Sequence, residues 1–184
     1  ILPELRRSRL IINYETIGRS DEQIKAQYSE DASKLSADEL LYSATLDEPV
    51  AKQEEIYKKT AETYPNDYRA YNNLAALALA KGDTAKAREY AQKAASLGAN
   101  TPEAQANLGL LSLIDGNVQD AERAIAKSSG SESVNQAIGT LAIAKGDYAQ
   151  AEKAFAKVNS NTAALAQLLN KNYDAAAKTL DRVE

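Results

Sequence analysis

Three copies of one short phrase recur along the chain, and their spacing constrains the fold more than any other feature. The copies are LAKGDTAKA at 79–87, LIDGNVQDA at 113–121 and IAKGDYAQA at 143–151, with a weaker fourth, NKNYDAA, at 170–176. Their glycines, Gly82, Gly116 and Gly146, are 34 and then 30 residues apart. Repeats of roughly 20–50 residues are typical of solenoids, in which each unit buries its apolar face against its neighbours. The sequence therefore predicts a stack of helix–turn–helix units.

The alanine content also favours closely packed helices. Residues 1–50 contain four alanines, whereas residues 51–184 contain 31. Small side chains let neighbouring helix backbones approach one another, and alanine has the highest intrinsic helix propensity. The first quarter of the chain is therefore expected to be built differently from the rest.

The residues around each phrase form a longer pattern. In the clearest copy it falls on Tyr71, Leu74, Ala75, Ala78, Gly82, Asp83, Ala87, Tyr90 and Ala94. With this pattern the chain resembles the tetratricopeptide repeat (TPR) family, although Gln105 replaces the aromatic residue of the next copy and Ala99 stands where the family has proline. The resemblance implies an all-α fold, a right-handed α-solenoid of TPR helix–turn–helix repeats over residues 20–184. Clear repeats are expected at about 67–158, a degenerate copy at about 37–66 and a short final copy at about 160–183.

Two kinds of position in the repeat have a physical explanation. Ala75 and its equivalents Gly109 and Gly139 are predicted to lie where the two helices of a repeat cross, since a larger side chain there would push the helices apart. The turn glycines are predicted to adopt positive φ, as Gly82 illustrates, because glycine does so without strain.

Residues 1–19 are expected to form an extended N-terminal segment that ends an upstream domain. Apolar and polar residues alternate from 9 to 17, which is typical of a β-strand. A single strand is not stable on its own, so it either belongs to an upstream sheet or lies extended against the helices. Capping residues predict helix starts at Ser20 and Ser36, and Pro49 suits the first turn of a third helix.

The front of the chain carries a second resemblance, in ILPELRRSR at 1–9, GRSDE at 18–22 and YPNDYRAYNN at 64–73. These stretches are similar to the junction in large Gram-negative envelope proteins in which TPRs follow an OmpA-like domain. The resemblance implies that residues 1–17 are the last strand of that domain, which in the family binds peptidoglycan through residues that would lie upstream. It also implies a periplasmic protein associated with the outer membrane. Because the sequence starts at Ile1, without Met, we expect it to be a piece of a longer polypeptide.

Composition excludes several functional classes. The chain has no cysteine and no histidine, so thiol nucleophiles, imidazole bases and Cys/His zinc sites are impossible. With 22 basic and 26 acidic residues, its net charge of −4 gives nucleic acids no electrostatic reason to bind. We expect no cofactor and, because no apolar run approaches the roughly 20 residues that span a bilayer, no membrane insertion by this chain.

Carboxylates remain as the residual catalytic option. The acidic residues cluster in pairs: Asp21/Glu22, Glu30/Asp31, Asp38/Glu39, Asp47/Glu48 and Glu54/Glu55. Adjacent residues point apart on a helix, so these pairs do not converge on one atom as a general acid and base must. Carboxylates also favour helix N-termini. The pattern is therefore interpreted as structural, and no catalytic or metal-binding residues are expected.

The TPR resemblance implies a partner-binding groove on the concave face, formed by the first helix of each repeat. Carried onto this chain, the groove comprises Arg69, Asn72, Ala76, Leu79, Glu103, Ala106, Leu110, Leu113, Ser133, Gln136, Thr140 and Ile143. Leucines clustered on a solvent-facing surface can mark a contact site; alternatively, the terminal segments cover them. Asn107 matches the asparagine of TPRs that clamp a C-terminal carboxylate, but Asn72 and Gln136 stand where that subclass needs cations.

The leading functional hypothesis is a protein–protein interaction scaffold, the TPR region of an envelope protein, which binds a protein or peptide on its concave face. One alternative is a cytoplasmic TPR adaptor or co-chaperone. A second alternative, from another class, is a helical enzyme that works through carboxylates. A signal peptide on the full-length protein would favour the envelope scaffold over the cytoplasmic adaptor.

Overall fold

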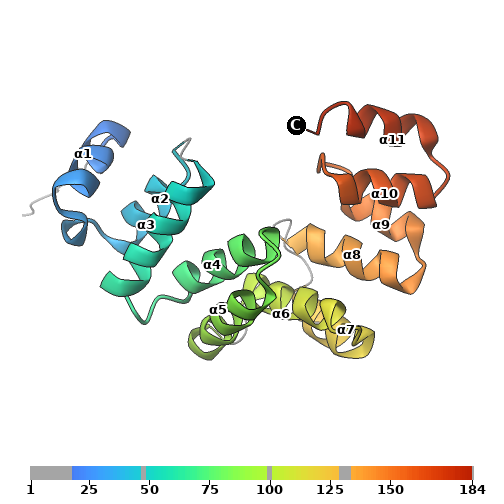
Figure 1. Ribbon diagram of the computed structural model, residues 1–184, viewed down its shortest axis with the longest axis horizontal. Helices are drawn as coiled ribbons and strands as arrows, with labels where there is room; N and C mark the ends of the chain where they lie inside the picture. The colour runs from blue at the N-terminus through green and yellow to red at the C-terminus, as the bar shows by residue number, and fades with distance from the viewer. Residues whose placement is uncertain (1–17, 47–48, 99–100, 129–133, 184) are drawn as a thin grey trace, which may run out of the picture.

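The computed structural model describes residues 18–46, 49–98, 101–128 and 134–183, and these residues form eleven α-helices and one short 3-10 helix. The helices are α1 (Asp21–Asp31), α2 (Ala37–Ser43), α3 (Val50–Thr63), α4 (Tyr68–Ala80), α5 (Thr84–Leu97), α6 (Pro102–Ile114), α7 (Val118–Ala126), α8 (Asn135–Lys145), α9 (Tyr148–Ala154), α10 (Asn161–Leu169) and α11 (Tyr173–Leu180), with the 3-10 helix at Ala32–Lys34. Figure 1 shows an open, curved stack with α1–α3 at one end and α9–α11 at the other. The predicted all-α solenoid is confirmed, whereas the strand expected over 9–17 lies outside the described residues.

The helix starts follow the capping residues. Ser20 and Ser36 each form a capping box, in which the serine side chain accepts from the third residue of the helix and that residue's side chain accepts from the serine N–H. Both predicted starts are confirmed. Pro49 is the N-cap of α3 and so precedes the helix instead of lying in its first turn. α3 ends at Thr63, before Pro65.

The glycine and the aspartate of the repeated phrase have separate tasks in the turn. Gly82, Gly116 and Gly146 have φ of 75°, 77° and 79°, so the prediction of positive φ is confirmed. The glycine, with its left-handed backbone, follows the end of the first helix of a repeat. The residue after it is the N-cap of the second helix. Asp83, for example, caps α5 by accepting from the N–H of Lys86 at 3.1 Å.

The predicted close helix crossings are also present. A Cβ built on Gly109 would lie 2.4 Å from Ile125 Cγ1, and one built on Gly139 would lie 2.4 Å from Phe155 Cε2. Ile125, on α7, and Phe155, at the end of α9, are both buried. In these two repeats the first helix therefore offers no side chain at the crossing, and the second helix fills the space.

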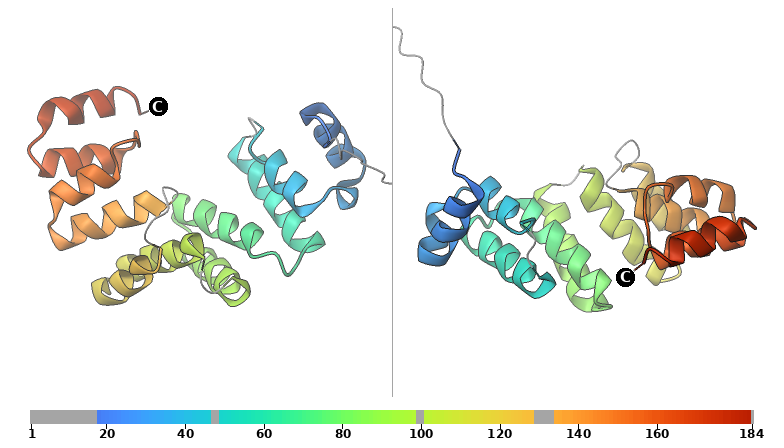
Figure 2. Two further views of the ribbon diagram at one scale, coloured as in Figure 1. Left: turned by 180° about the vertical axis from the view of Figure 1, so that it is seen from behind. Right: turned by 90° about the horizontal axis from the view of Figure 1, so that it is seen from above.

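One set of polar contacts recurs at equivalent positions between neighbouring repeats. The second helix of one repeat reaches the turn of the next through Glu54 to Lys81, Arg88 to Asp115, Glu122 to Lys145, and Glu152 to Asn170 and Asn172. In the second of these contacts the charges are exchanged: the base, Arg88, lies on the helix and the acid, Asp115, lies in the turn. We call this series the polar ladder. Each repeat buries its apolar face against its neighbours between these contacts, and this packing holds the first helices in a row along the inner side of the curve (Figures 1 and 2).

Candidate functional site

The first helices of four successive repeats share one groove on the concave face. Its volume is about 460 Å³, and it is lined by Ala76, Leu79, Ala80, Asn107, Leu110, Leu113, Ile114, Gln136, Thr140 and Thr162. We call it the leucine groove. Six residues expected from the sequence come together in it: Ala76, Leu79, Leu110, Leu113, Gln136 and Thr140. Its contributors lie on α4, α6, α8 and α10, so only the curvature of the solenoid can assemble it.

The apolar surface extends further along the concave side than the sequence analysis expected. Leu165 and Leu168 on α10 are 45% and 44% exposed. Counted back from the turn, they occupy the positions of Leu110 and Leu113 in α6. They were missed because the groove positions were assigned in the three clear repeats and not in the short final copy, whose turn has Lys171 in place of glycine. Lys171 nevertheless adopts positive φ, 65°, as the glycines do.

A second cavity, of about 450 Å³, adjoins the groove toward the N-terminus. It is lined by Leu41, Tyr42, Thr45, Tyr57, Tyr68, Arg69, Asn72, Asn73 and Glu103. We call it the tyrosine pocket. It contains three further groove residues expected from the sequence, Arg69, Asn72 and Glu103. Tyr42 and Tyr57 were missed because α2 and α3 lack the repeated phrase that fixed the register elsewhere.

A buried asparagine pair forms the boundary between the two cavities. Asn107 Nδ2 donates to Asn72 Oδ1 at 2.8 Å and to the Asn72 carbonyl oxygen at 3.2 Å. Asn72 lines the tyrosine pocket and Asn107 lines the leucine groove, although both are more than 90% buried. Asn72 is therefore mainly a packing residue between α4 and α6 and not, as expected, a solvent-facing one.

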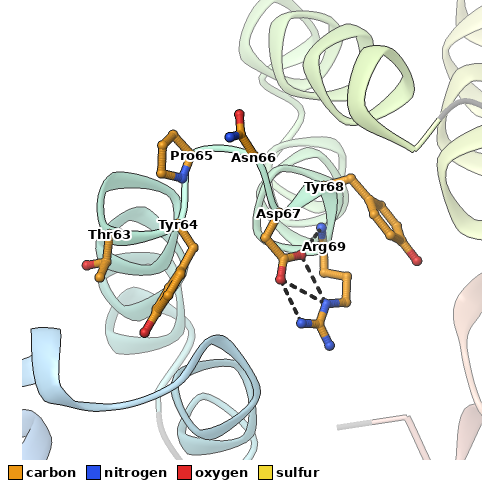
Figure 3. Close-up of a pocket in the computed structure, with 7 residues that line it drawn as sticks. All are labelled: Thr63, Tyr64, Pro65, Asn66, Asp67, Tyr68 and Arg69. Carbon is orange, nitrogen blue, oxygen red and sulfur yellow. Dashed lines mark hydrogen bonds and ion pairs between the residues drawn. The ribbon is translucent and has the colours of Figure 1, made fainter.

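Arg69 was expected as a groove cation, but it is held by carboxylates. Its Nη2 donates to Asp67 Oδ2 and its Nη1 to Asp38 Oδ1, both at 2.6 Å. Figure 3 shows the guanidinium turned toward Asp67, with Tyr64 and Tyr68 pointing away from one another. The guanidinium in turn lowers the pKa of the Asp67 carboxyl. Arg69 therefore ties α2 to α4 across the wall of the tyrosine pocket.

The turn drawn in Figure 3 also encloses a cavity, of about 510 Å³, between Thr63 and Arg69. Its polar side chains serve the fold. Tyr64 donates its hydroxyl to the Leu35 carbonyl oxygen at 2.6 Å, and Asp67 caps α4 by accepting from the Arg69 N–H. We therefore assign no binding role to this turn.

The remaining expected residues do not line either cavity. Ala106 is buried against Ala121 and Ile125, because α6 is enclosed by its neighbours on both sides. Ile143 packs, half-buried, on the core around Phe155. Ala106 is therefore a packing residue and not a solvent-facing one, whereas the groove role of Ile143 stays a prediction. Ser133 lies outside the described residues.

The carboxylates are arranged as structural ion pairs. Lys58 and Lys81, which both donate to Glu54, lower the pKa of Glu54 to about 2. Every carboxyl with a displaced pKa in the described part of the chain is displaced downward, as Asp31, Glu39 and Asp83 also illustrate. A general acid at neutral pH needs the opposite displacement. Within the described ranges, we found no cluster of acidic residues able to hold a metal ion. Nor is any helix there both long and apolar enough to cross a membrane.

Comparison with known proteins agrees with the fold. The family model described as tetratricopeptide repeat matches residues 56–89, from the middle of α3 into α5. No curated protein matches the chain. The fold is similar to a chain of the APC/C hetero-tetramer Cut9–Hcn1, with a TM-score of 0.63 and 15% identity over 88% of this chain; the match spans 38% of the length of that neighbour.

Two smaller TPR proteins are covered almost completely. A thermophilic TPR protein of Thermus thermophilus has a TM-score of 0.58 and 17% identity, over 86% of this chain and 89% of its own. YrrB, described as a TPR protein with an unusual peptide-binding site, has a TM-score of 0.51 and 17% identity, over 88% and 91%. At such identities these likenesses establish the fold, a TPR-type helical solenoid.

Proposed function

We propose that the protein is an interaction scaffold that binds a peptide segment of a partner protein in the leucine groove. The observation that carries the proposal is the composition of that groove. Three leucines and an isoleucine from two successive first helices meet there beside uncharged polar side chains. Apolar surface gathered in a concave site is typical of protein-binding and ligand-binding surfaces. Solved TPR proteins include one described as having a peptide-binding site.

The chemistry of the carboxylates supports a scaffold over an enzyme. Among the acidic residues that were candidates for acid–base chemistry, Glu54 and Asp38 are bonded to lysine or arginine of a neighbouring helix or turn. Ionised carboxylates in ion pairs have no proton to donate near neutral pH. The polar groups of the leucine groove are amides and hydroxyls, which orient a ligand and do not transform it.

The experiment is a peptide selection with matched variants. Purified protein is screened against a phage-displayed library of random peptides, and the enriched peptides are synthesised for fluorescence anisotropy. We expect Ala76→Asp, which places a charge in the groove at an exposed position, to abolish binding. Ala126→Asp, an equal change at an exposed position of α7 outside the groove, should leave it unchanged.

Leu110→Asp provides a second test of the same groove, and circular dichroism with a thermal melt verifies that each variant is folded. Binding that survives both Ala76→Asp and Leu110→Asp in folded protein would contradict the proposal. So would a selection that enriches no peptide.

We further propose that this scaffold belongs to an envelope-associated, periplasmic protein. The support is the resemblance of residues 1–9, 18–22 and 64–73 to a junction with an OmpA-like domain. Fractionation of cells that express the full-length protein tests this location. Recovery with the outer-membrane and periplasmic fractions supports it, and recovery in the cytoplasm would favour the cytoplasmic adaptor instead.

A further inference from the structure

The tyrosine pocket differs in chemistry from the leucine groove beside it. The leucine groove is lined by apolar residues and uncharged polar residues. The tyrosine pocket has three aromatic rings, from Tyr42, Tyr57 and Tyr68, together with charged residues. Tyr42 is 47% exposed, so part of its side chain is accessible to a ligand. The two cavities therefore select different side chains.

Each of the three rings is held in place by the surrounding helices. The Tyr42 hydroxyl donates to Asp21 Oδ1 at 3.1 Å. Tyr57 is buried, which raises the pKa of its hydroxyl, and Asn73 is hydrogen-bonded to it. Tyr68 lies so close to Gly98 that a Cβ there would be 2.6 Å from the ring carbon Cγ. The pocket walls are thus preformed, which limits the entropy lost on binding.

The charge around the pocket is negative. Arg69, its basic lining residue, is bonded to both Asp67 and Asp38, so its charge is more than offset by these carboxylates. Glu103 adds a further carboxylate to the lining. These four side chains sum to 1 − 3 = −2. Arg19, which precedes α1, is paired with Glu39 of α2, and this pair adds no net charge.

We propose that the tyrosine pocket binds a lysine or arginine side chain of the partner peptide whose apolar side chain occupies the leucine groove. This inference rests on the proposed function and adds the chemistry of the partner. A cation is attracted both to the faces of tyrosine rings and to the carboxylates. An acidic side chain would be repelled by the carboxylates, and an apolar one would gain nothing from them.

The asparagine pair keeps the two binding sites adjacent. Asn72 borders one cavity and Asn107 the other, and the two side chains are hydrogen-bonded. A peptide that fills both sites therefore crosses this pair, and its basic and apolar side chains lie close together in its sequence. The occupant is thus a short basic–apolar segment of a partner protein.

The test uses the phage-displayed random peptides described above. We expect the enriched peptides to share a lysine or arginine within a few residues of a leucine, isoleucine or phenylalanine. In each synthetic peptide the basic residue is then replaced by glutamine. This replacement should weaken binding to the unaltered protein about tenfold, the loss typical of one charge-assisted contact, and should have little effect on binding to Glu103→Gln. Glu89→Gln, at an exposed position of α5, is the matched control.

The outcomes separate this inference from the proposed function. Suppose that the enriched peptides lose binding on Ala76→Asp and so bind in the leucine groove. The inference is then overturned, and the proposed function stands, if these peptides lack a basic residue. The same holds if replacing their basic residue by glutamine weakens binding to Glu103→Gln as much as binding to the unaltered protein. A selection without any enriched peptide would overturn both. A decrease in affinity with added salt that vanishes in Glu103→Gln would support the cation site.

Discussion

The crossing of α8 and α9 allows a sharp prediction about stability, because two effects of opposite sign meet at Gly139. Glycine in a helix interior costs about 1 kcal/mol relative to alanine, so Gly139→Ala should stabilise α8 by that amount if there were space. There is none: the new Cβ would lie 2.4, 2.5 and 2.8 Å from three carbons of the Phe155 ring, where ordinary contact begins at 3.4 Å.

The overlap should be the larger effect. Phe155 is 1% exposed, so its ring can move only by displacing the core around it. Overpacking of this kind costs about 1–3 kcal/mol. After the gain in helix propensity is subtracted, Gly139→Ala should lower the free energy of unfolding by about 1 kcal/mol.

Removing the ring should reverse the sign. In a Phe155→Ala background, which itself costs about 3–5 kcal/mol, the space for a methyl group is open and Gly139→Ala should stabilise by about 1 kcal/mol. The two substitutions are therefore coupled by about 2 kcal/mol. The first clear repeat already uses this combination, since the equivalent residues are Ala75 and Ala91, both fully buried.

Urea denaturation followed by circular dichroism gives the four free energies, and tyrosine fluorescence checks that the transitions coincide, because repeat proteins can unfold in parts. The matched control is Ala75→Gly, which should destabilise by about 1 kcal/mol through lost propensity. Stabilisation of the otherwise unaltered protein by Gly139→Ala, or an equal effect with and without Phe155, would contradict a clash at this crossing.

Three further predictions concern the turns and the ion pairs. Lys171→Gly should stabilise the protein by about 1 kcal/mol, because Lys171 has φ of 65° and glycine adopts such an angle without strain. Thermal melts measure the change, and Gly146→Ala, which should destabilise, is the opposite control. Glu54→Gln should lower the free energy of unfolding by about 1 kcal/mol near neutral pH, after screening by solvent. The folded pKa of Glu54, about 2, is below its usual 4.5, so the difference between the two proteins should persist above pH 5 and vanish as the pH falls toward 2. Urea titrations at several pH values measure it. In the polar ladder, Arg88→Glu and Asp115→Lys should each destabilise slightly, and the double variant should recover most of the loss; additive losses would contradict a direct contact.

The repeated phrase allowed the fold to be predicted because its residues act locally. Gly82 adopts positive φ and Asp83 caps the next helix whatever the neighbouring repeats do. The crossing residues Gly109 and Gly139 were predicted for a similar reason, since each contacts the second helix of its own repeat. A residue whose role has a local cause has the same role in every copy of the repeat. The position of these residues in the repeat was therefore enough to predict their roles.

The groove residues were harder to predict because exposure depends on how neighbouring helices enclose a position. Ala106 and Asn72 occupy concave-face positions in the register, but α4, α6 and α8 pack closely enough to bury both. Leu79 and Leu110, further along the same helices, remain at the cavity. The repeat register indicates which face a residue is on, whereas the curvature of the stack decides how deep it lies.

The same distinction explains why the tyrosine pocket had no signal in the repeat pattern. Tyr42 and Tyr57 lie on α2 and α3, whose turn lacks the Gly-Asp phrase, and Tyr68 begins α4. A degenerate repeat is released from the requirement for small residues that closely packed repeats share, so it can place large side chains beside the groove. The degenerate repeat thus brings Tyr42 and Tyr57 to a pocket that Tyr68 and Glu103 of the clear repeats complete. Under the proposed cation site, selectivity for a partner should depend more on these residues than on the leucines, which any apolar segment can satisfy.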